Sequence, residues 1–166
     1  MICKLSEEDI EQAVGIFAQY PKDFNSLGIK KLKEELEEYA GESVSLETKG
    51  FFVEKEASQV IGLIGYVMRP SNEYEITWLA VRPDWQRRGI GKGLLEYVEQ
   101  ALKNFRSEWL KLEVPNDPAT MNFYSAMGFS EELSEFSERN KVIYKKKLLA
   151  FKPTFKAGIS GDGLWR

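Results

Sequence analysis

A strand-like run that leads through a basic, glycine-containing turn directly into a helix-like run restricts the fold more than any other feature of this chain. The run Tyr74–Val81 is rich in aromatic and β-branched residues, which favour strands. We expect a helix to begin near Gly89 and Gly91, with an apolar face made of Leu94, Leu95, Val98, Leu102 and Phe105. The segment therefore places a strand and a helix in direct succession, as part of a mixed α+β pattern.

The chain before this segment predicts one strand, two helices and a hairpin. We expect the strand at residues 2–5 and a helix after Ser6-Glu7-Glu8-Asp9, which has the spacing of a capping box. A second amphipathic helix is expected at residues 29–39, and a hairpin at residues 51–55 and 60–68.

The chain after the segment predicts a further strand, a helix and a second hairpin. The strand is expected at residues 110–114, and Asp117 and Pro118 form the typical start of a helix. The hairpin is expected at residues 129–136 and 142–149. The complete order, βααβββαβαββ, predicts an α+β (mixed α/β) fold with one central, mostly antiparallel sheet flanked by helices.

Length and composition indicate a single globular domain. The chain has 166 residues, 43% of them hydrophobic and 30% charged, and no run approaches the ~18 apolar residues of a membrane span. We expect one domain over residues 1–149 and an irregular tail over residues 150–166, with no membrane as partner. The start of the chain turns acidic within a few residues, unlike a signal or transit peptide, so the cytoplasm is the expected location.

The charge balance and the inventory of side chains exclude several classes of function. A net charge of −3 argues against nucleic acid as a partner, because binding its phosphates needs a basic face. The single cysteine, Cys3, allows no internal disulfide. The absence of histidine excludes Ser-His-Asp and Cys-His catalysis and histidine-ligated metal sites, and we expect no metal. A general base must be Glu, Asp, an unusual Lys or Tyr, or a water chain.

The turn Gln86-Arg87-Arg88-Gly89-Ile90-Gly91 predicts an anion site because it joins a strand to a helix start. The first N–H groups of a helix are unpaired and the helix dipole favours negative charge there. Gly89 and Gly91 allow close approach of an anion, while the flanking arginines and Lys92 supply positive charge. The spacing fits neither a dinucleotide fingerprint nor a P-loop. An ordinary basic turn remains the alternative interpretation.

Two segments together resemble a known family. Residues 79–92, LAVRPDWQRRGIGK, are similar to the acetyl-CoA signature of the GNAT superfamily of N-acetyltransferases, in which a strand ending in apolar-Ala-Val precedes R-x-x-G-x-G or Q-x-x-G-x-G. Residues 112–129, LEVPNDPATMNFYSAMGF, resemble the family's second signature: strand, Asn, helix, aromatic-Tyr and Gly-Phe. The resemblance implies a GNAT-like acyl-CoA N-acyltransferase fold and transfer of an acetyl group from acetyl-CoA to an amine by direct attack in a ternary complex.

The same resemblance implies a site for acetyl-CoA on three segments. Backbone groups of Leu79, Ala80 and Val81, on a bulged and splayed strand, would contact the pantetheine arm. The pyrophosphate would lie against a turn formed by Gln86, Arg87, Arg88, Gly89, Ile90, Gly91 and Lys92. From the second signature, Asn116, Asn122 and Tyr124 would border the cofactor.

Two carboxylates are candidates for the base that deprotonates the amine. At pH 7 an alkylamine with a pKa near ~10.4 is almost entirely protonated, which opposes the reaction by about 4.6 kcal/mol. Glu73 and Glu75 differ by two positions, so both point to the same face of the strand. The resemblance aligns Glu75 with the base of histone-acetylating members and Glu73 with that of some ribosomal-protein-acetylating members. A water chain, or a purely solvated role for both carboxylates, is the alternative.

Two further groups complete the chemistry that the resemblance implies. The Leu79 N–H would stabilise the oxyanion, and Tyr124 would protonate the leaving thiolate. The alternative for Tyr124 is packing beside Phe123 and Phe129.

The acceptor is not evident from the sequence, and two other classes of function remain possible. The amine could belong to a small molecule, a peptide N-terminus or a lysine, and either a monomer or a homodimer is compatible with the sequence. Phe24, Trp78 and Trp85 could line an acceptor pocket, although core packing is the first interpretation of Trp78. The alternatives are a non-catalytic acyl-CoA sensor and an interaction domain that uses its aromatic tail.

Overall fold

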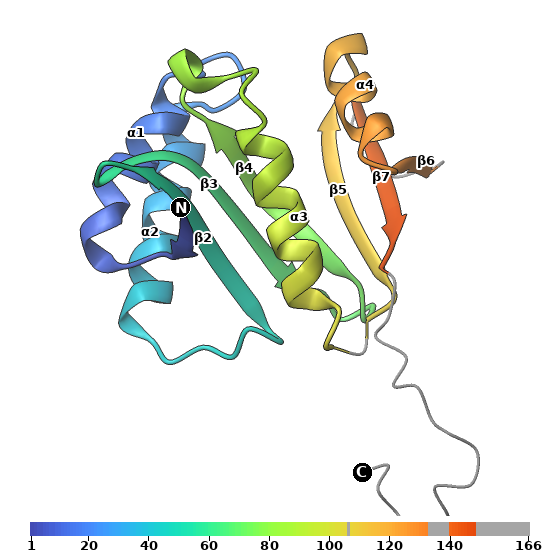
Figure 1. The fold of residues 1–166 in the computed structure, drawn as a ribbon, viewed down its shortest axis with the longest axis horizontal. Helices are drawn as coiled ribbons and strands as arrows, with labels where there is room; N and C mark the ends of the chain where they lie inside the picture. The colour runs from blue at the N-terminus through green and yellow to red at the C-terminus, as the bar shows by residue number, and fades with distance from the viewer. Residues whose placement is uncertain (106, 133–139, 149–166) are drawn as a thin grey trace, which may run out of the picture.

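The computed structural model describes residues 1–105, 107–132 and 140–148, which contain one mixed sheet of seven strands (Figure 1). The strand order is β1-β2-β3-β4-β5-β7-β6. The strands are β1 (Ile2–Lys4), β2 (Lys49–Glu56), β3 (Gln59–Met68), β4 (Tyr74–Val81), β5 (Trp109–Pro115), β6 (Ser130–Glu132) and β7 (Lys141–Lys147). All neighbouring pairs are antiparallel except β4 and β5, which run parallel. This arrangement confirms the predicted mixed, mostly antiparallel sheet.

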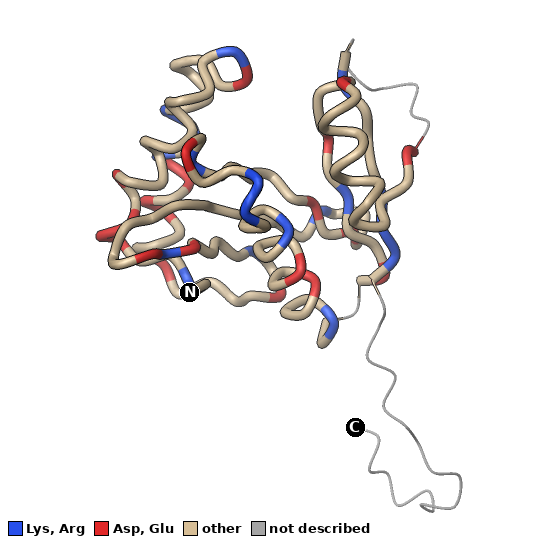
Figure 2. The backbone as a smooth tube through the Cα atoms, turned by 45° about the horizontal axis from the view of Figure 1, so that its top comes forward, with Lys and Arg blue, Asp and Glu red and all other residues tan. Residues whose placement is uncertain are grey.

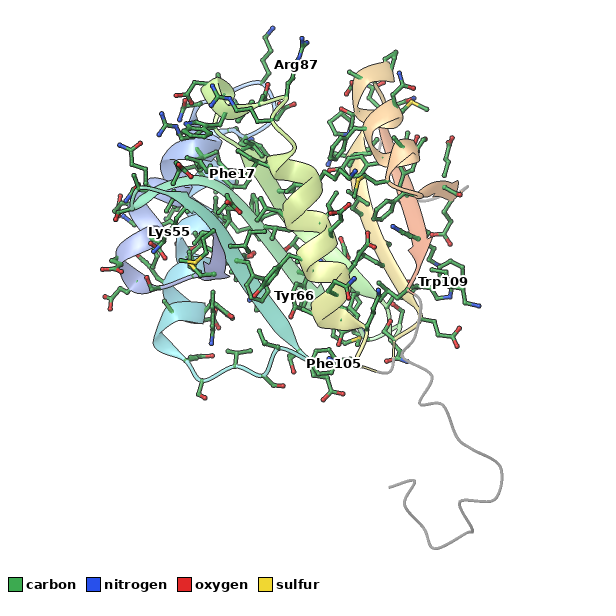
Figure 3. The ribbon with its side chains drawn as sticks, in the orientation of Figure 1. Phe17, Lys55, Tyr66, Arg87, Phe105 and Trp109 are labelled. Carbon is green, nitrogen blue, oxygen red and sulfur yellow. The ribbon has the colours of Figure 1, made fainter. Side chains whose placement is uncertain are left out.

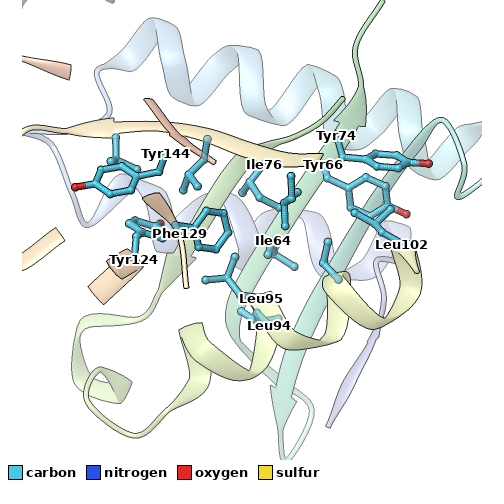
Figure 4. Packing of buried hydrophobic residues seen from close by; sticks show 14 of the residues in the cluster. Ile64, Tyr66, Tyr74, Ile76, Leu94, Leu95, Leu102, Tyr124, Phe129 and Tyr144 are labelled. Atoms are coloured by element: carbon cyan, nitrogen blue, oxygen red, sulfur yellow. The ribbon is translucent and has the colours of Figure 1, made fainter. Parts of the chain in front are cut away.

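Helices cover both faces of the sheet and form two hydrophobic cores with it (Figure 1). Helices α1 (Ile10–Ala18) and α2 (Ser26–Gly41) pack on one face. Helices α3 (Ile90–Leu102) and α4 (Pro118–Ala126) belong to the other core, which joins them to the inner strands (Figure 4). Two 3-10 turns, η1 (Glu7–Asp9) and η2 (Pro83–Trp85), complete the elements. None of the helices in the described ranges is long and apolar enough to cross a membrane.

Local signals in the chain predict most helix and strand ends correctly. Strand β4 has the predicted bounds, and Asp117 caps α4 by accepting a hydrogen bond from the Thr120 N–H at 2.9 Å. The Ser6 N–H and Oγ both donate to Asp9 Oδ2. Ser6 thus caps the turn η1, which leads directly into α1. Because a capping side chain satisfies N–H groups that the helix leaves unpaired, these positions are the ones most readily predicted.

One helix end differs from the prediction. Helical spacing places Phe105 on the apolar face of α3, but that helix ends at Leu102. The Phe105 N–H bonds the Leu102 carbonyl at 3.0 Å, and its ring packs beside Tyr74 with 6.4 Å between centroids. The side chain thus reaches the predicted core from a turn, which helical spacing alone does not distinguish from another helical residue. The predicted residues 133–136, the end of the last hairpin and the tail over 150–166 lie outside the described residues, and the domain boundary stays a prediction.

Candidate functional site

The end of β4 presents backbone groups to an open edge of the sheet. The β3–β4 register shifts between Gly65 and Tyr66, which pair with Trp78 and Ile76 and leave Thr77 as an extra residue, a β-bulge. Beyond the bulge, the Arg82 N–H donates to the Ile61 carbonyl at 2.8 Å. Hydrogen-bonded and non-hydrogen-bonded pairs alternate in an antiparallel ladder, so pairs two positions apart are alike.

That alternation fixes which backbone groups of β4 are available. Val81, opposite Gly62, and Leu79, opposite Ile64, occupy non-hydrogen-bonded positions, so their N–H and C=O groups point away from β3. Ala80, opposite Leu63, points its backbone groups into the β3 ladder, which differs from the expectation that all three residues would face the ligand.

On the side to which Leu79 and Val81 point, the sheet is splayed. The pairing of β4 with β5 consists of Tyr74 with Leu110 and Glu75 with Lys111, and in the described residues it does not continue beyond them. Figure 1 shows the two strands diverging from this point, with α3 over one and α4 over the other. The backbone of Leu79 and Val81 therefore faces a notch in the β ladder, the stretch in which β4 has no recorded pairing with β5 in the described residues.

The basic turn lies at the same end of β4 and carries unusual backbone geometry. Arg87 and Gly89 both have positive φ, +62° and +77°, and α3 begins at the next residue, Ile90. The first hydrogen bond of the helix runs from the Gly93 N–H to the Gly89 carbonyl at 2.9 Å, which leaves the preceding N–H groups at the helix start available. Left-handed residues near a helix start turn N–H groups toward a common point, a geometry that binds anions.

The cations of the turn differ in how they are held. The Arg88 guanidinium lies 4.5 Å from the centroid of the Trp85 ring, a cation–π contact that orients it. Arg87 is exposed and projects away from the body of the protein (Figure 3). Lys92 Nζ lies 3.8 Å from Glu96 on the surface of α3. Charged residues of both signs are otherwise spread along the backbone (Figure 2).

Helix α4 lies beside the end of β4 and the start of α3. A Cβ added at Gly91 would lie 3.6 Å from Phe123 of α4 and 3.7 Å from Val81, so three elements meet at this glycine. Asn116 and Asn122 are exposed, at the end of β5 and on α4 respectively. The turn, the end of β4 and α4 are thus brought together, and the contacts of each residue with the cofactor stay predictions.

Tyr124 is the one residue of α4 that is buried, at 7% exposure. Its ring packs edge-on against Phe123 and Phe129, with centroids 5.0 and 5.8 Å away, and lies near Tyr144 (Figure 4). Burial raises the pKa of the Tyr124 phenol well above its ordinary value. The phenol is therefore protonated at neutral pH, as a proton donor must be, but it is a weaker acid than an exposed tyrosine.

The two candidate bases lie at the other end of β4, each beside cations. Glu75 accepts a hydrogen bond from Arg69 Nε at 2.6 Å. Glu73 lies 2.6 Å from Lys145 Nζ and 3.3 Å from Lys111 Nζ. The hydrogen bond from Lys145 lowers the pKa of the Glu73 carboxyl, and Lys111 lowers it further. At about 3.3 Å per residue, Glu73 is roughly 20 Å and Glu75 roughly 13 Å from Leu79 along the strand.

Tyr20, which sequence analysis did not single out, also reaches the site. Its hydroxyl donates to the Val81 carbonyl at 2.5 Å and accepts a hydrogen bond from Gln86 Nε2 at 2.6 Å. Its own carbonyl accepts bonds from the N–H groups of Asp23 and Phe24. Tyr20 thus ties the α1–α2 connection to both parts of the site. No local pattern marks it, because a lone tyrosine at a helix end has many ordinary uses.

The three predicted acceptor-pocket aromatics have different surroundings. Trp78 and Phe24 pack with Phe17, and the Trp78 indole N–H donates to Glu35 Oε2 at 2.8 Å. Both are partly buried on the α1–α2 face of the sheet. Trp85 instead belongs to the turn, where Arg88 covers its ring.

These features define a class of domain: an α+β fold whose splayed strand and adjoining helix start can hold an elongated, anionic ligand. The sequence profile of the Acetyltransferase (GNAT) family matches residues 15–129. The chain belongs to this family.

Curated relatives are similar over part of the chain. A protein from Bacillus methanolicus named "Uncharacterized N-acetyltransferase in lysA 3'region" is 32% identical over 84 residues, which are 51% of this chain and 64% of that protein. The peptidyl-lysine N-acetyltransferase YiaC of Escherichia coli (strain K12) is 42% identical over 69 residues, 40% of this chain and 42% of that protein. The chain therefore spans less than two thirds of the length of these relatives.

Solved structures share the fold. An acetyltransferase of the GNAT family from Desulfovibrio desulfuricans has a TM-score of 0.78 and 22% identity, covering 89% of this chain and 98% of its own. PaiA N-acetyltransferase from Thermoplasma acidophilum, solved with coenzyme A, has a TM-score of 0.69 and 23% identity, with the same coverage. At these identities the likeness establishes the fold, which confirms the predicted GNAT-like architecture.

Proposed function

We propose that the protein transfers an acetyl group from acetyl-CoA to a primary amine. The observation that carries the proposal is the open edge of β4, where the backbone groups of Leu79 and the N–H of Val81 face a notch beside an anion-binding turn. An extended ligand with a charged end fits this arrangement, because the turn matches the pyrophosphate and the strand edge matches the amides of the pantetheine arm. Membership of the family and the names of the relatives support the same activity.

In the proposed reaction the amine nitrogen attacks the acetyl carbonyl carbon, and the new C–N bond forms as the carbonyl electrons move to oxygen. The Leu79 N–H, which points into the notch, donates to that oxygen. When the C–S bond breaks, the departing thiolate takes a proton from the Tyr124 hydroxyl. The ammonium nitrogen loses two protons on the way to the amide. One is released to water before the attack, and the other, lost after the attack, returns through water to the Tyr124 phenolate, so the products are an amide, a thiol and one released proton.

We propose Glu75, acting through water, as the acceptor of the amine proton. It lies closer to Leu79 than Glu73 does, and a gap of roughly 13 Å requires water between carboxylate and amine. Two lysines lower the pKa of Glu73, which makes its carboxylate a weaker base than a free glutamate. An acceptor related to peptidyl lysine is part of the proposal, and the name of the Escherichia coli relative supports it.

Release of free thiol from acetyl-CoA, followed with a panel of amines and lysine peptides, tests the proposal. The parent protein should release thiol in proportion to an acetylated product identified by mass spectrometry. Gly89→Glu places bulk and negative charge at the left-handed position of the turn, so a folded variant should lose binding of acetyl-CoA. Binding of acetyl-CoA without turnover on any amine would instead favour a sensor.

A further inference from the structure

Lys146 on β7 makes three hydrogen bonds that the proposed mechanism does not use. Its Nζ donates to Glu99 Oε1 and Oε2, both at 3.0 Å, and to the Met127 carbonyl at 2.7 Å. The three donors of the ammonium are thereby all used. The side chains of Lys146 and Glu99 are 26% and 15% exposed, so the pair is screened less by water than a surface pair.

The contact joins the two sides of the splayed sheet. Glu99 lies on α3, which packs on β2, β3 and β4, whereas Met127 follows α4 and Lys146 lies beyond β5. Since the β4–β5 ladder extends only from Tyr74 to Glu75 on the β4 side in the described residues, few backbone bonds connect these halves. The Lys146 ammonium supplies a polar connection on the α3–α4 face.

The position of α4 depends on such a connection because its packing is slight. Tyr124 is the single buried residue of this helix. The Tyr124 carbonyl accepts hydrogen bonds from the Met127 and Phe129 N–H groups in the turn that Lys146 holds. Gly128 in that turn has φ of +88°, and a Cβ there would lie 3.3 Å from Lys146 Cε. A cation at the carboxyl end of a helix also complements its dipole.

We propose that Lys146, anchored by Glu99, is a positioning residue that fixes the end of α4 and so holds the Tyr124 ring in its packing against Phe129 and Tyr144. The geometric part of this proposal is that Lys146 fixes the turn formed by Met127, Gly128 and Phe129. The consequence for turnover rests on the proposed function, in which Tyr124 is the proton donor.

The test uses Lys146→Met in the full chain, which keeps the aliphatic stem and removes the ammonium. Lys147→Met is the matched control, because Lys147 is the exposed next residue of the same strand. Amide hydrogen exchange at Phe129 reports on the turn, since its N–H bonds the Tyr124 carbonyl at 3.0 Å. We expect exchange at Phe129 to accelerate about tenfold, equivalent to 1.36 kcal/mol, with exchange in β4 unchanged.

The kinetic arm separates positioning from general destabilisation. Lys146→Met should lower kcat about tenfold while the Kd for coenzyme A stays within about twofold, since the turn and the β4 edge belong to the other half of the sheet. In a Tyr124→Phe background the same substitution should have little further effect on kcat, because its route to the reaction is already removed. Lys146→Arg, which keeps the charge, should recover part of the loss.

Different results overturn different statements. Unchanged exchange at Phe129 in Lys146→Met would refute the inference, whatever the activity. If Tyr124→Phe inactivates the protein, faster exchange at Phe129 with full turnover in Lys146→Met would refute the proposed effect on turnover. Equal losses of kcat on adding Lys146→Met to the parent and to Tyr124→Phe would refute it as well. A fully active Tyr124→Phe protein would refute the proposed proton donor, while the exchange result would still decide the geometric part.

Discussion

The two ends of β4 lie in one strand but differ in almost every respect that matters to binding. At its start, Tyr74 and Glu75 pair with β5, and Glu73 and Glu75 are held by Lys145, Lys111 and Arg69. At its end, the backbone of Leu79 and Val81 faces a notch, and the turn that follows has two left-handed residues. The closed end satisfies its polar groups within the protein. At the open end the Val81 carbonyl bonds Tyr20, and the backbone of Leu79 and the Val81 N–H point away from β3.

The comparison shows how a sheet can be both a scaffold and a binding surface. A backbone group that is not paired in the ladder is available for a ligand. The sheet then lacks one of the hydrogen bonds that join neighbouring strands. The bulge at Thr77 changes the register near the point where β5 departs, and the ion pairs of Glu73 with Lys111 and Lys145 join the closed end to β5 and β7. Substitutions at the open end should therefore alter binding and turnover, and those at the closed end stability, with Glu75 as the exception if it receives the amine proton.

The largest effect is expected at Tyr124, the buried residue of α4 and the proposed proton donor. Tyr124→Phe removes the proton donor and keeps the ring, so packing against Phe129 should survive. General acid catalysis contributes ~10²–10⁴-fold, and the raised pKa of the buried phenol favours the lower end of that range. We expect kcat to fall by about 10²-fold with nearly unchanged affinity for acetyl-CoA, measured by thiol release and calorimetry. Normal turnover would leave Tyr124 as a packing residue.

A smaller, pH-dependent effect is expected at the closed end if Glu75 receives the amine proton. Glu75→Gln should lower turnover about tenfold near neutral pH, and the loss should shrink as pH rises and the amine arrives deprotonated. Glu73→Gln is the matched control and should leave the shape of the pH–rate profile unchanged. If Glu73→Gln alone alters the profile, the assignment of the two carboxylates is reversed.

Glycines of α3 offer a comparison within one helix. A methyl group at Gly91 would meet Phe123 and Val81 at ordinary contact distances, whereas nothing lies within 4 Å of one at Gly93. Neither alanine should harm the fold, and each should favour the helix by up to about 1 kcal/mol. We expect Gly91→Ala to weaken coenzyme A binding several-fold, because its methyl enters the notch, and Gly93→Ala to leave it unchanged. Equal affinities in calorimetry would remove Gly91 from the site.

The sequence predicts the strands, helices and turns at both ends of β4 better than it predicts the side-chain contacts between them. The effects of Asp117, Pro118 and the glycines of the turn are confined to the neighbouring backbone. A short window of sequence is therefore enough to predict them. The contact of Tyr20 with Val81 and that of Lys146 with Glu99 span 61 and 47 positions. Nothing local in the chain marks such pairs. The family resemblance implied a bulged, splayed strand, but the direction of the Ala80 backbone follows only from the register.

The smallest effect is expected for the stability of the closed end, through Glu73. Its pKa is lowered in the folded protein, chiefly by the hydrogen bond from Lys145, so the pair contributes stability above the unfolded carboxyl's pKa of about 4.3. That contribution is lost as pH falls through the lower folded value. Because the carboxylate is only partly buried, we expect Glu73→Gln to reduce the free energy of unfolding at pH 7 by about 1 kcal/mol or less. Between roughly pH 5 and pH 3, the parent should lose stability more steeply than the variant, and the two unfolding curves should converge. Chemical denaturation across this pH range would show whether the lysine pairs at Glu73 hold β4 to its neighbours. Glu131→Gln, on the exposed edge strand β6, is the control. If the stability curves of parent and Glu73→Gln run parallel at every pH, the closed end is joined by its backbone ladder alone.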